Sequence, residues 1–202
     1  GIYIYAYATE TFTYFDLTTP NNVRITSIVN HILQDKDGNL WFSTNGQGLF
    51  RYNLSKNYLE QYEFTSAFGI VASTMADSDN QIWALTNQGE SGVYKLNKAE
   101  NKFEPFGLLY NAGNHHSQAL AMLEDSEQTL WLGTWECGLQ KIDKYTRQTT
   151  TYLHPTDGKG VTHIHSLMEY APHQLLIGSD DGLLLFNTLT EEYKLFTENE
   201  TV

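Results

Sequence analysis

The feature that most constrains this chain is an internal repeat of about 45 residues. Trp83 follows Trp41 by 42 residues, Trp131 follows Trp83 by 48, and Leu176 occupies the same place in a fourth repeat. A glycine then follows in every repeat, and an aspartate opens the first three. These recurring residues are Gly48, Gly92, Gly138, Gly182, Asp35, Asp77 and Asp125. A period of this length is typical of β-propellers.

Each repeat divides into four short strands separated by turn residues. In the first repeat, 29–34 forms the first strand, Trp41 lies on the second, Gly48 opens the third, and Tyr58 and Tyr62 lie on the fourth. No segment shows a helical apolar face of useful length. Four-stranded antiparallel units at this period are propeller blades, so we predict an all-β propeller fragment.

The blade boundaries follow from the same alignment. Gly1-Ile2-Tyr3 matches the start of a third strand, and the fourth repeat lacks both the aspartate and the tryptophan. We therefore expect half of a preceding blade and then four complete blades, of which the fourth is divergent. The expected ranges are 1–17, 18–64, 65–107, 108–154 and 155–202. We expect the recurring tryptophans to be packing residues, each with its indole N–H bonded to a carbonyl of a neighbouring blade.

Composition excludes several classes of function. The formal charge of −12 repels phosphate backbones and anionic lipid, which argues against nucleic-acid or membrane-surface binding. The longest apolar runs have the length of a strand, so no membrane span is expected. Asp35-x-Asp37-x-Asn39 imitates a calcium loop, but its twelfth position is Gly46 instead of glutamate. We interpret it as a hairpin turn and expect no metal or cofactor.

The complete frame in the first repeat, Asp-x-x-Gly-Asn-Leu-Trp-x-x-Thr-x-x-Gly-Leu, resembles the two-component regulator propeller repeat. The resemblance covers essentially the whole chain. It implies a periplasmic location, in the sensor part of a hybrid two-component system of Bacteroides-type bacteria. Members of that family typically carry seven-bladed propellers and look like sensors of oligosaccharides, so the resemblance implies the same for this chain. The matching residues are architectural, so the resemblance implies fold and context and assigns no binding residue.

Candidate binding residues lie outside the repeat frame. The loop after the second strand and the connection entering the first strand open on one face of a blade. Trp135 occupies that loop in the third repeat, where the other repeats have Asn45, Asn87 and Asp180. The entering connections contribute histidines, and the candidate set is Trp135, His116, His163, Asp180, His115 and His165.

A tryptophan beside histidine and aspartate suits a sugar, because the ring stacks on C–H faces while polar groups bond hydroxyls. Two other interpretations stay open. In the first, Trp135 covers a blade edge beside ordinary surface histidines. In the second, the four histidines bind a metal.

The leading functional prediction is a non-catalytic extracytoplasmic sensor that binds an oligosaccharide. An alternative is a scaffold whose blade edges bind protein partners. A glycan-cleaving enzyme is less favoured, because paired catalytic carboxylates would face one channel and the recurring aspartates lie at turns. We also expect further blades in the parent chain. Four and a half blades leave apolar faces bare at both ends, so we expect self-association of this segment.

Overall fold

The computed structural model describes residues 1–64, 69–86, 92–106, 118–153, 161 and 163–196. All regular secondary structure in these ranges is β-strand, which confirms the predicted all-β class. No helix within them has the length and hydrophobicity needed to cross a bilayer.

The strands form one two-stranded sheet and four four-stranded antiparallel sheets. The hairpin consists of β1 (Tyr3–Ala6) and β2 (Thr11–Tyr14). Blade 1 contains β3 (Val29–Gln34), β4 (Leu40–Thr44), β5 (Leu49–Asn53) and β6 (Tyr58–Tyr62). Blade 2 contains β7 (Val71–Ala76), β8 (Ile82–Thr86), β9 (Val93–Asn97) and β10 (Lys102–Pro105). Blade 3 contains β11 (Ala119–Glu124), β12 (Leu130–Thr134), β13 (Leu139–Ile142) and β14 (Thr149–Tyr152). Blade 4 contains β15 (Ile164–Ala171), β16 (Gln174–Ser179), β17 (Gly182–Asn187) and β18 (Tyr193–Phe196).

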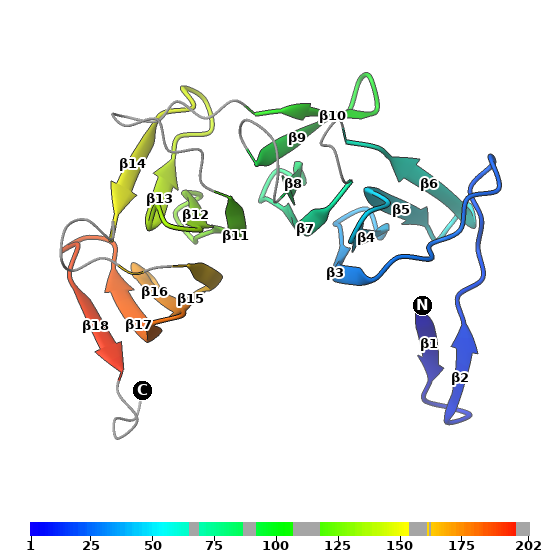
Figure 1. Cartoon of the computed structure of the whole chain (residues 1–202), viewed down its shortest axis with the longest axis horizontal. Helices are drawn as coiled ribbons and strands as arrows, with labels where there is room; N and C mark the ends of the chain where they lie inside the picture. The colour runs from blue at the N-terminus through cyan, green and yellow to red at the C-terminus, as the bar shows by residue number, and fades with distance from the viewer. Residues whose placement is uncertain (65–68, 87–91, 107–117, 154–160, 162, 197–202) are drawn as a thin grey trace.

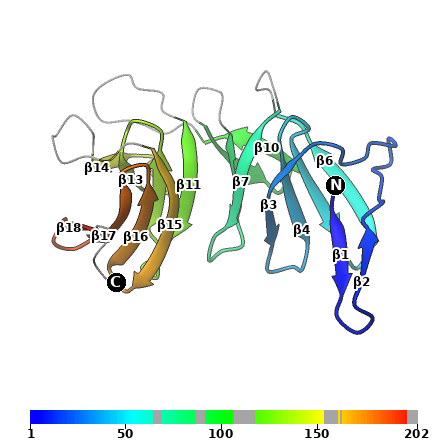
Figure 2. The ribbon, with the colours of Figure 1, turned by 60° about the horizontal axis from the view of Figure 1, so that its bottom comes forward.

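The blades follow one another along an open arc (Figure 1). The first strand of each blade, β3, β7, β11 or β15, lies on the inside of the arc, and the fourth strand lies on the outside. First strands of neighbouring blades contact one another. Figure 2 shows the same sheets side by side, with the β1–β2 hairpin at one end and blade 4 at the other. This is the arrangement of a propeller fragment.

A buried hydrogen bond between aspartate and tryptophan recurs in the first three blades. The indole nitrogens of Trp41, Trp83 and Trp131 donate to the recurring aspartate of the same blade at 2.8, 3.0 and 2.7 Å. The other carboxylate oxygen accepts two backbone N–H groups of the turn between the first two strands, as Asp125 does from Glu127 and Thr129. One side chain therefore closes the turn and holds the indole.

The predicted partner of the indole was wrong. We expected a carbonyl of the neighbouring blade, whereas the acceptor is the carboxylate six residues earlier in the same blade. The three tryptophans lie on second strands and are buried, as predicted. The hydrogen bond also explains why the two residues are replaced together in blade 4. Without the indole donor, the carboxylate would lose its buried partner, and Tyr170 and Leu176 replace the pair together.

The hydrophobic core lies between blades. Trp41 packs against Ile82 and Tyr94 of the next blade, and the clusters around Trp83 and Trp131 repeat this arrangement. Polar contacts accompany the packing at the turn edge. Ser78 bonds Glu124 of blade 3, and Ser126 bonds Glu169 of blade 4 in the same way. Adjacent blades are thus joined by apolar contact and by one serine–glutamate contact at two junctions.

The two ends of the arc expose apolar side chains. The β1–β2 hairpin exposes Tyr3, Tyr5 and Phe12, whose exposed fractions are 63%, 39% and 71%. At the other end, Met168 of blade 4 is 60% exposed. Every complete blade boundary within the arc buries the corresponding face, so these are blade-packing faces without a neighbouring blade in the structure.

Replacing Asp125 tests the recurring hydrogen bond. We expect Asp125→Ala to lower the free energy of unfolding by about 3 kcal/mol, because a buried indole and two turn N–H groups lose their acceptor. Glu127→Ala is the matched control in the same turn, since its side chain is exposed. Denaturant unfolding measures both variants. Equal stability of the two variants would contradict a structural role for Asp125.

Candidate functional site

The β12–β13 loop holds Trp135 at a fixed position. The Thr134 hydroxyl donates to the Gly138 carbonyl at 2.7 Å and accepts the Cys137 N–H at 3.1 Å. Gly138 has φ +68°, and a Cβ atom there would lie 2.5 Å from the Tyr152 carbonyl oxygen. Only glycine fits this turn. The loop is therefore short, hydrogen-bonded and closely packed on the outer strand.

In blades 1 and 3 the backbone makes the same contact at the position of Trp135. Its N–H donates to the Gln118 carbonyl at 2.9 Å, and the N–H of the equivalent Asn45 donates to the Ile28 carbonyl at the same distance. The Trp135 side chain is 40% exposed, unlike the three buried repeat tryptophans. An indole at this position is therefore an addition to the repeat, which its folding does not require.

Three side chains of blade 4 surround this indole. The His163 ring stacks on Trp135 with a centroid distance of 3.6 Å and an interplanar angle of 26°. Asp180 lies between two imidazoles, with 2.5 Å from its carboxylate to His163 Nδ1 and 2.7 Å to His165 Nε2. Trp135, His163, His165 and Asp180 thus form one cluster across the junction of blades 3 and 4. We call these four residues the Trp135 cluster.

Strand irregularities place the two histidines. The pairing of β15 with β16 shifts register between Ile164 and Ser166, which leaves His165 as a bulge residue. Such a bulge redirects its side chain, and the same shift recurs in β3, β7 and β11. His163 has φ +39°, a left-handed conformation that is uncommon outside glycine. Both features direct imidazoles toward the β16–β17 loop that carries Asp180.

The cluster concentrates polar groups beside an aromatic face. Hydrogen bonds from His163 and then from His165 hold the pKa of the Asp180 carboxyl below its usual value. Asp180 and His165 side chains are about half exposed, whereas that of His163 is 20% exposed. Donors, an acceptor and part of an indole therefore meet solvent together, which is the composition of a site for a hydroxylated ligand.

Not every predicted site residue can be located. His115 and His116 lie outside the described residues, so their place relative to the Trp135 cluster stays a prediction. Among the residues that are described, no group of three or more histidine, cysteine, aspartate or glutamate side chains is arranged to hold a metal ion. The sequence predicted that Trp135, His163 and Asp180 meet at this junction, and the structure brings them together. Their role in binding stays a prediction.

Comparisons with known proteins agree with the repeat. Residues 22–46 match the family model described as the two component regulator propeller. This confirms the resemblance of the repeat frame. A protein of Formosa agariphila named as a histidine kinase is 26% identical over 189 residues, which is 89% of this chain and 13% of the kinase. This chain therefore spans about an eighth of that relative.

Solved structures share the fold. The extracellular domain of a hybrid two-component system of B. thetaiotaomicron matches 99% of this chain with a TM-score of 0.77 and 22% identity, over 26% of its own length. Virginiamycin B lyase of Staphylococcus aureus matches 95% of this chain with a TM-score of 0.70 and 16% identity, over 61% of its length. Both likenesses support the propeller fold, although the two proteins have different functions.

The carboxyl group of Asp180 reports on the cluster. In carboxyl-carbon NMR titrations we expect its midpoint to lie below the usual aspartate value and to rise in a His163→Ala/His165→Ala double variant. Because the folded-state pKa is depressed, this contact stabilises the fold above the unfolded-state pKa and is lost as the pH falls through the folded value. An unchanged midpoint in the double variant would contradict the bridging geometry.

Proposed function

We propose that this chain is part of the non-catalytic, periplasmic sensor region of a hybrid two-component regulator and that it binds an oligosaccharide at the Trp135 cluster. The observation that carries the proposal is the half-exposed indole at a position where the repeat needs only a backbone N–H. The two-component regulator propeller match and the extracellular domains with the same fold support the sensor context.

The chemistry of the cluster suits a neutral sugar. Aromatic rings stack on the C–H faces of pyranoses, a contact worth about 1 kcal/mol by analogy with other ring contacts. The carboxylate of Asp180 accepts hydroxyl hydrogens, and the imidazoles of His163 and His165 offer further donors or acceptors. Each well-placed hydrogen bond adds about 1 kcal/mol. One such cluster gives weak binding, so a sensor would add contacts from other blades or a partner subunit.

A catalytic function is less well supported. The three recurring aspartates are buried and hydrogen-bonded to tryptophans, so none of them faces a channel as a catalytic acid or base. Asp180 has a depressed pKa, and a general acid requires a raised pKa. The fold is shared with a lyase, but a shared fold does not transfer chemistry.

Removing the indole tests the binding role. We would screen neutral oligosaccharides by thermal shift and measure the best one by calorimetry. We expect Trp135→Ala to weaken its affinity about fivefold, the equivalent of the stacking energy. Tyr7→Ala is the matched control, because Tyr7 is an exposed aromatic residue on the distant hairpin. If both variants bind as the parent chain does, Trp135 has no role in binding.

The exposed end faces support a second proposal, that copies of this chain associate end to end through the β1–β2 hairpin and blade 4. We expect sedimentation velocity to show a mass that increases with concentration. Phe12→Ser and Met168→Ser should each shift this equilibrium toward monomer, since they remove exposed apolar area from opposite ends. A monomer at every concentration would contradict association.

A further inference from the structure

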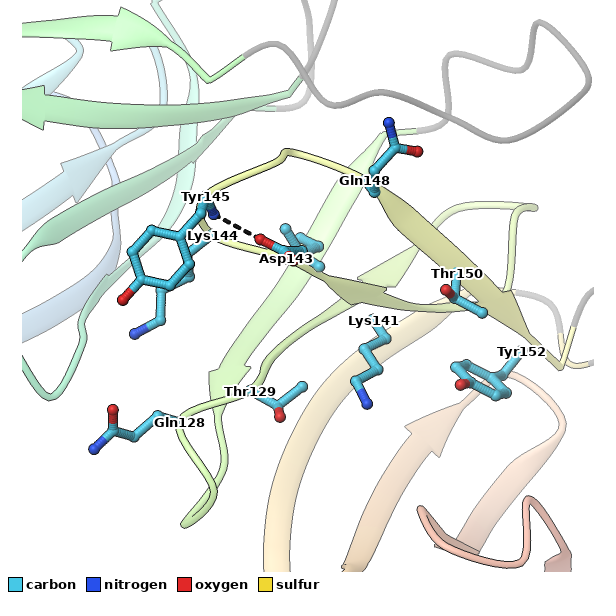
Figure 3. Close-up of a pocket in the computed structure, with 10 residues that line it drawn as sticks. Gln128, Thr129, Lys141, Asp143, Lys144, Tyr145, Gln148, Thr150 and Tyr152 are labelled. Carbon is cyan, nitrogen blue, oxygen red and sulfur yellow. Dashed lines mark hydrogen bonds between the residues drawn. The ribbon is translucent and has the colours of Figure 1, made fainter.

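A cavity of about 450 Å³ lies on the outer part of blade 3, beside the β13–β14 turn. Its lining combines a cation, hydroxyls, amides and an aromatic ring. Figure 3 shows Lys141 between Thr129 and Tyr152, while Lys144 and Tyr145 project from the turn itself. Because β13 runs away from the loop that carries Trp135, this cavity is at the opposite end of the blade from the Trp135 cluster.

The repeat shows what is unusual about Lys141. In blades 1, 2 and 3 a cation on the third strand contacts the buried tryptophan, at 5.6 Å for Arg51, 5.2 Å for Lys95 and 5.9 Å for Lys141. In the first two blades a glutamate on the fourth strand stands opposite this cation. Glu60 faces Arg51, and Glu104 faces Lys95.

Blade 3 keeps the cation and lacks the acid. Thr150 stands opposite Lys141, and Lys141 makes no ion pair with any residue that the structure describes. In blade 1 the corresponding charge is neutralised, because Arg51 and Glu60 form an ion pair at 2.6 Å. The substitution of threonine for glutamate therefore leaves an exposed ammonium group at the wall of a cavity.

The next blade also leaves this cavity open. At the first junction Asn101 of blade 2 donates to Glu60 and accepts from Tyr62, which closes the space beside Arg51. At the second junction Arg147 lies over Phe106, and the cavity there is about 280 Å³. In blade 4, Glu191 occupies the turn position that Asn101 and Arg147 occupy in blades 2 and 3. The cavity of about 450 Å³ remains beside Lys141 at this junction. Its volume is within the range of roughly 300–1,000 Å³ that small-molecule sites occupy.

We propose that this cavity binds a carboxylate-bearing saccharide, with the Lys141 ammonium group as the anchor for the carboxylate. The hydroxyls of Thr129 and Thr150 and the amide of Gln128 match the hydroxyls of a sugar, and the Tyr152 ring offers a stacking face. This site goes beyond the proposed neutral-sugar site, since it lies at the other end of the blade and takes a charged ligand.

The other charges near the cavity define the selectivity. The Lys144 ammonium group is paired with Glu124, and the Asp143 carboxylate accepts the N–H groups of Tyr145 and Thr146 at 2.8 and 2.9 Å. Glu191 lies near Tyr152, whose pKa is raised by burial and then by this negative charge. Among the lining residues Lys141 is therefore the cation without an ion pair, while the carboxylates of Asp143 and the nearby Glu191 oppose anion binding.

The test uses the 202-residue chain and two matched probes, trigalacturonate and its fully methyl-esterified form. Calorimetry at low ionic strength should show at least tenfold tighter binding of the acid, the effect of one charge-assisted hydrogen bond. Lys141→Met should remove that preference. Lys95→Met is the matched control, because it changes the equivalent cation of blade 2, and it should leave the preference intact.

Substitutions at two further positions, Thr150 and Glu191, test the role of charge directly. Thr150→Glu restores the acid found opposite the cation in blades 1 and 2 and should abolish binding of trigalacturonate, whereas Thr150→Gln should retain it. Glu191→Gln should tighten binding at least twofold. Thermal melts check that each variant is folded.

The outcomes separate this site from the Trp135 cluster. Equal affinity for both probes, or a preference that survives Lys141→Met, would overturn the proposal. So would loss of trigalacturonate binding in Trp135→Ala, which would assign the ligand to the other site. Acetate that binds as tightly as trigalacturonate would overturn the saccharide assignment.

Discussion

The structure depends on one buried contact, the hydrogen bond from a tryptophan indole to an aspartate carboxylate six residues earlier. In blades 1 to 3 this contact fixes the turn between the first two strands and sets the indole into the interface with the next blade. Burial of a carboxylate is tolerated because its oxygens accept an indole and two backbone donors. Since the bond is local, each blade can form it before its neighbour packs against it.

Most of the fold could be predicted because its determinants lie at fixed intervals in the sequence. Trp41, Trp83 and Trp131 gave the second strands, and the following glycines gave the start of the third. The partner of the indole could not be assigned, because a neighbouring carbonyl was an equally reasonable acceptor. One sign of the true partner was present: Tyr170 and Leu176 replace the aspartate and the tryptophan together.

The candidate sites differ in how far the sequence alone indicated them. Trp135 was identified because the other repeats have asparagine or aspartate at its position. Asp180 was identified because it occupies the equivalent loop position in the next blade. The stacking of His163 on the indole and the bulge at His165 depend on backbone geometry that no residue pattern predicts. Lys141 was missed, because its distinctive feature is the cross-strand neighbour. The exchange of glutamate for Thr150 is recognisable only when the register of the third and fourth strands is known.

The chain is therefore a regular repeat with local substitutions, and the proposed ligand sites lie at two of them, Trp135 and Thr150. Indole NMR tests this account most directly, because the four tryptophans give four N–H signals. The Trp41, Trp83 and Trp131 signals are expected to exchange slowly with solvent and to stay in place when a neutral saccharide is added, while the Trp135 signal moves. Rapid exchange of the three repeat indoles, or a Trp135 signal that no neutral saccharide shifts, would contradict it.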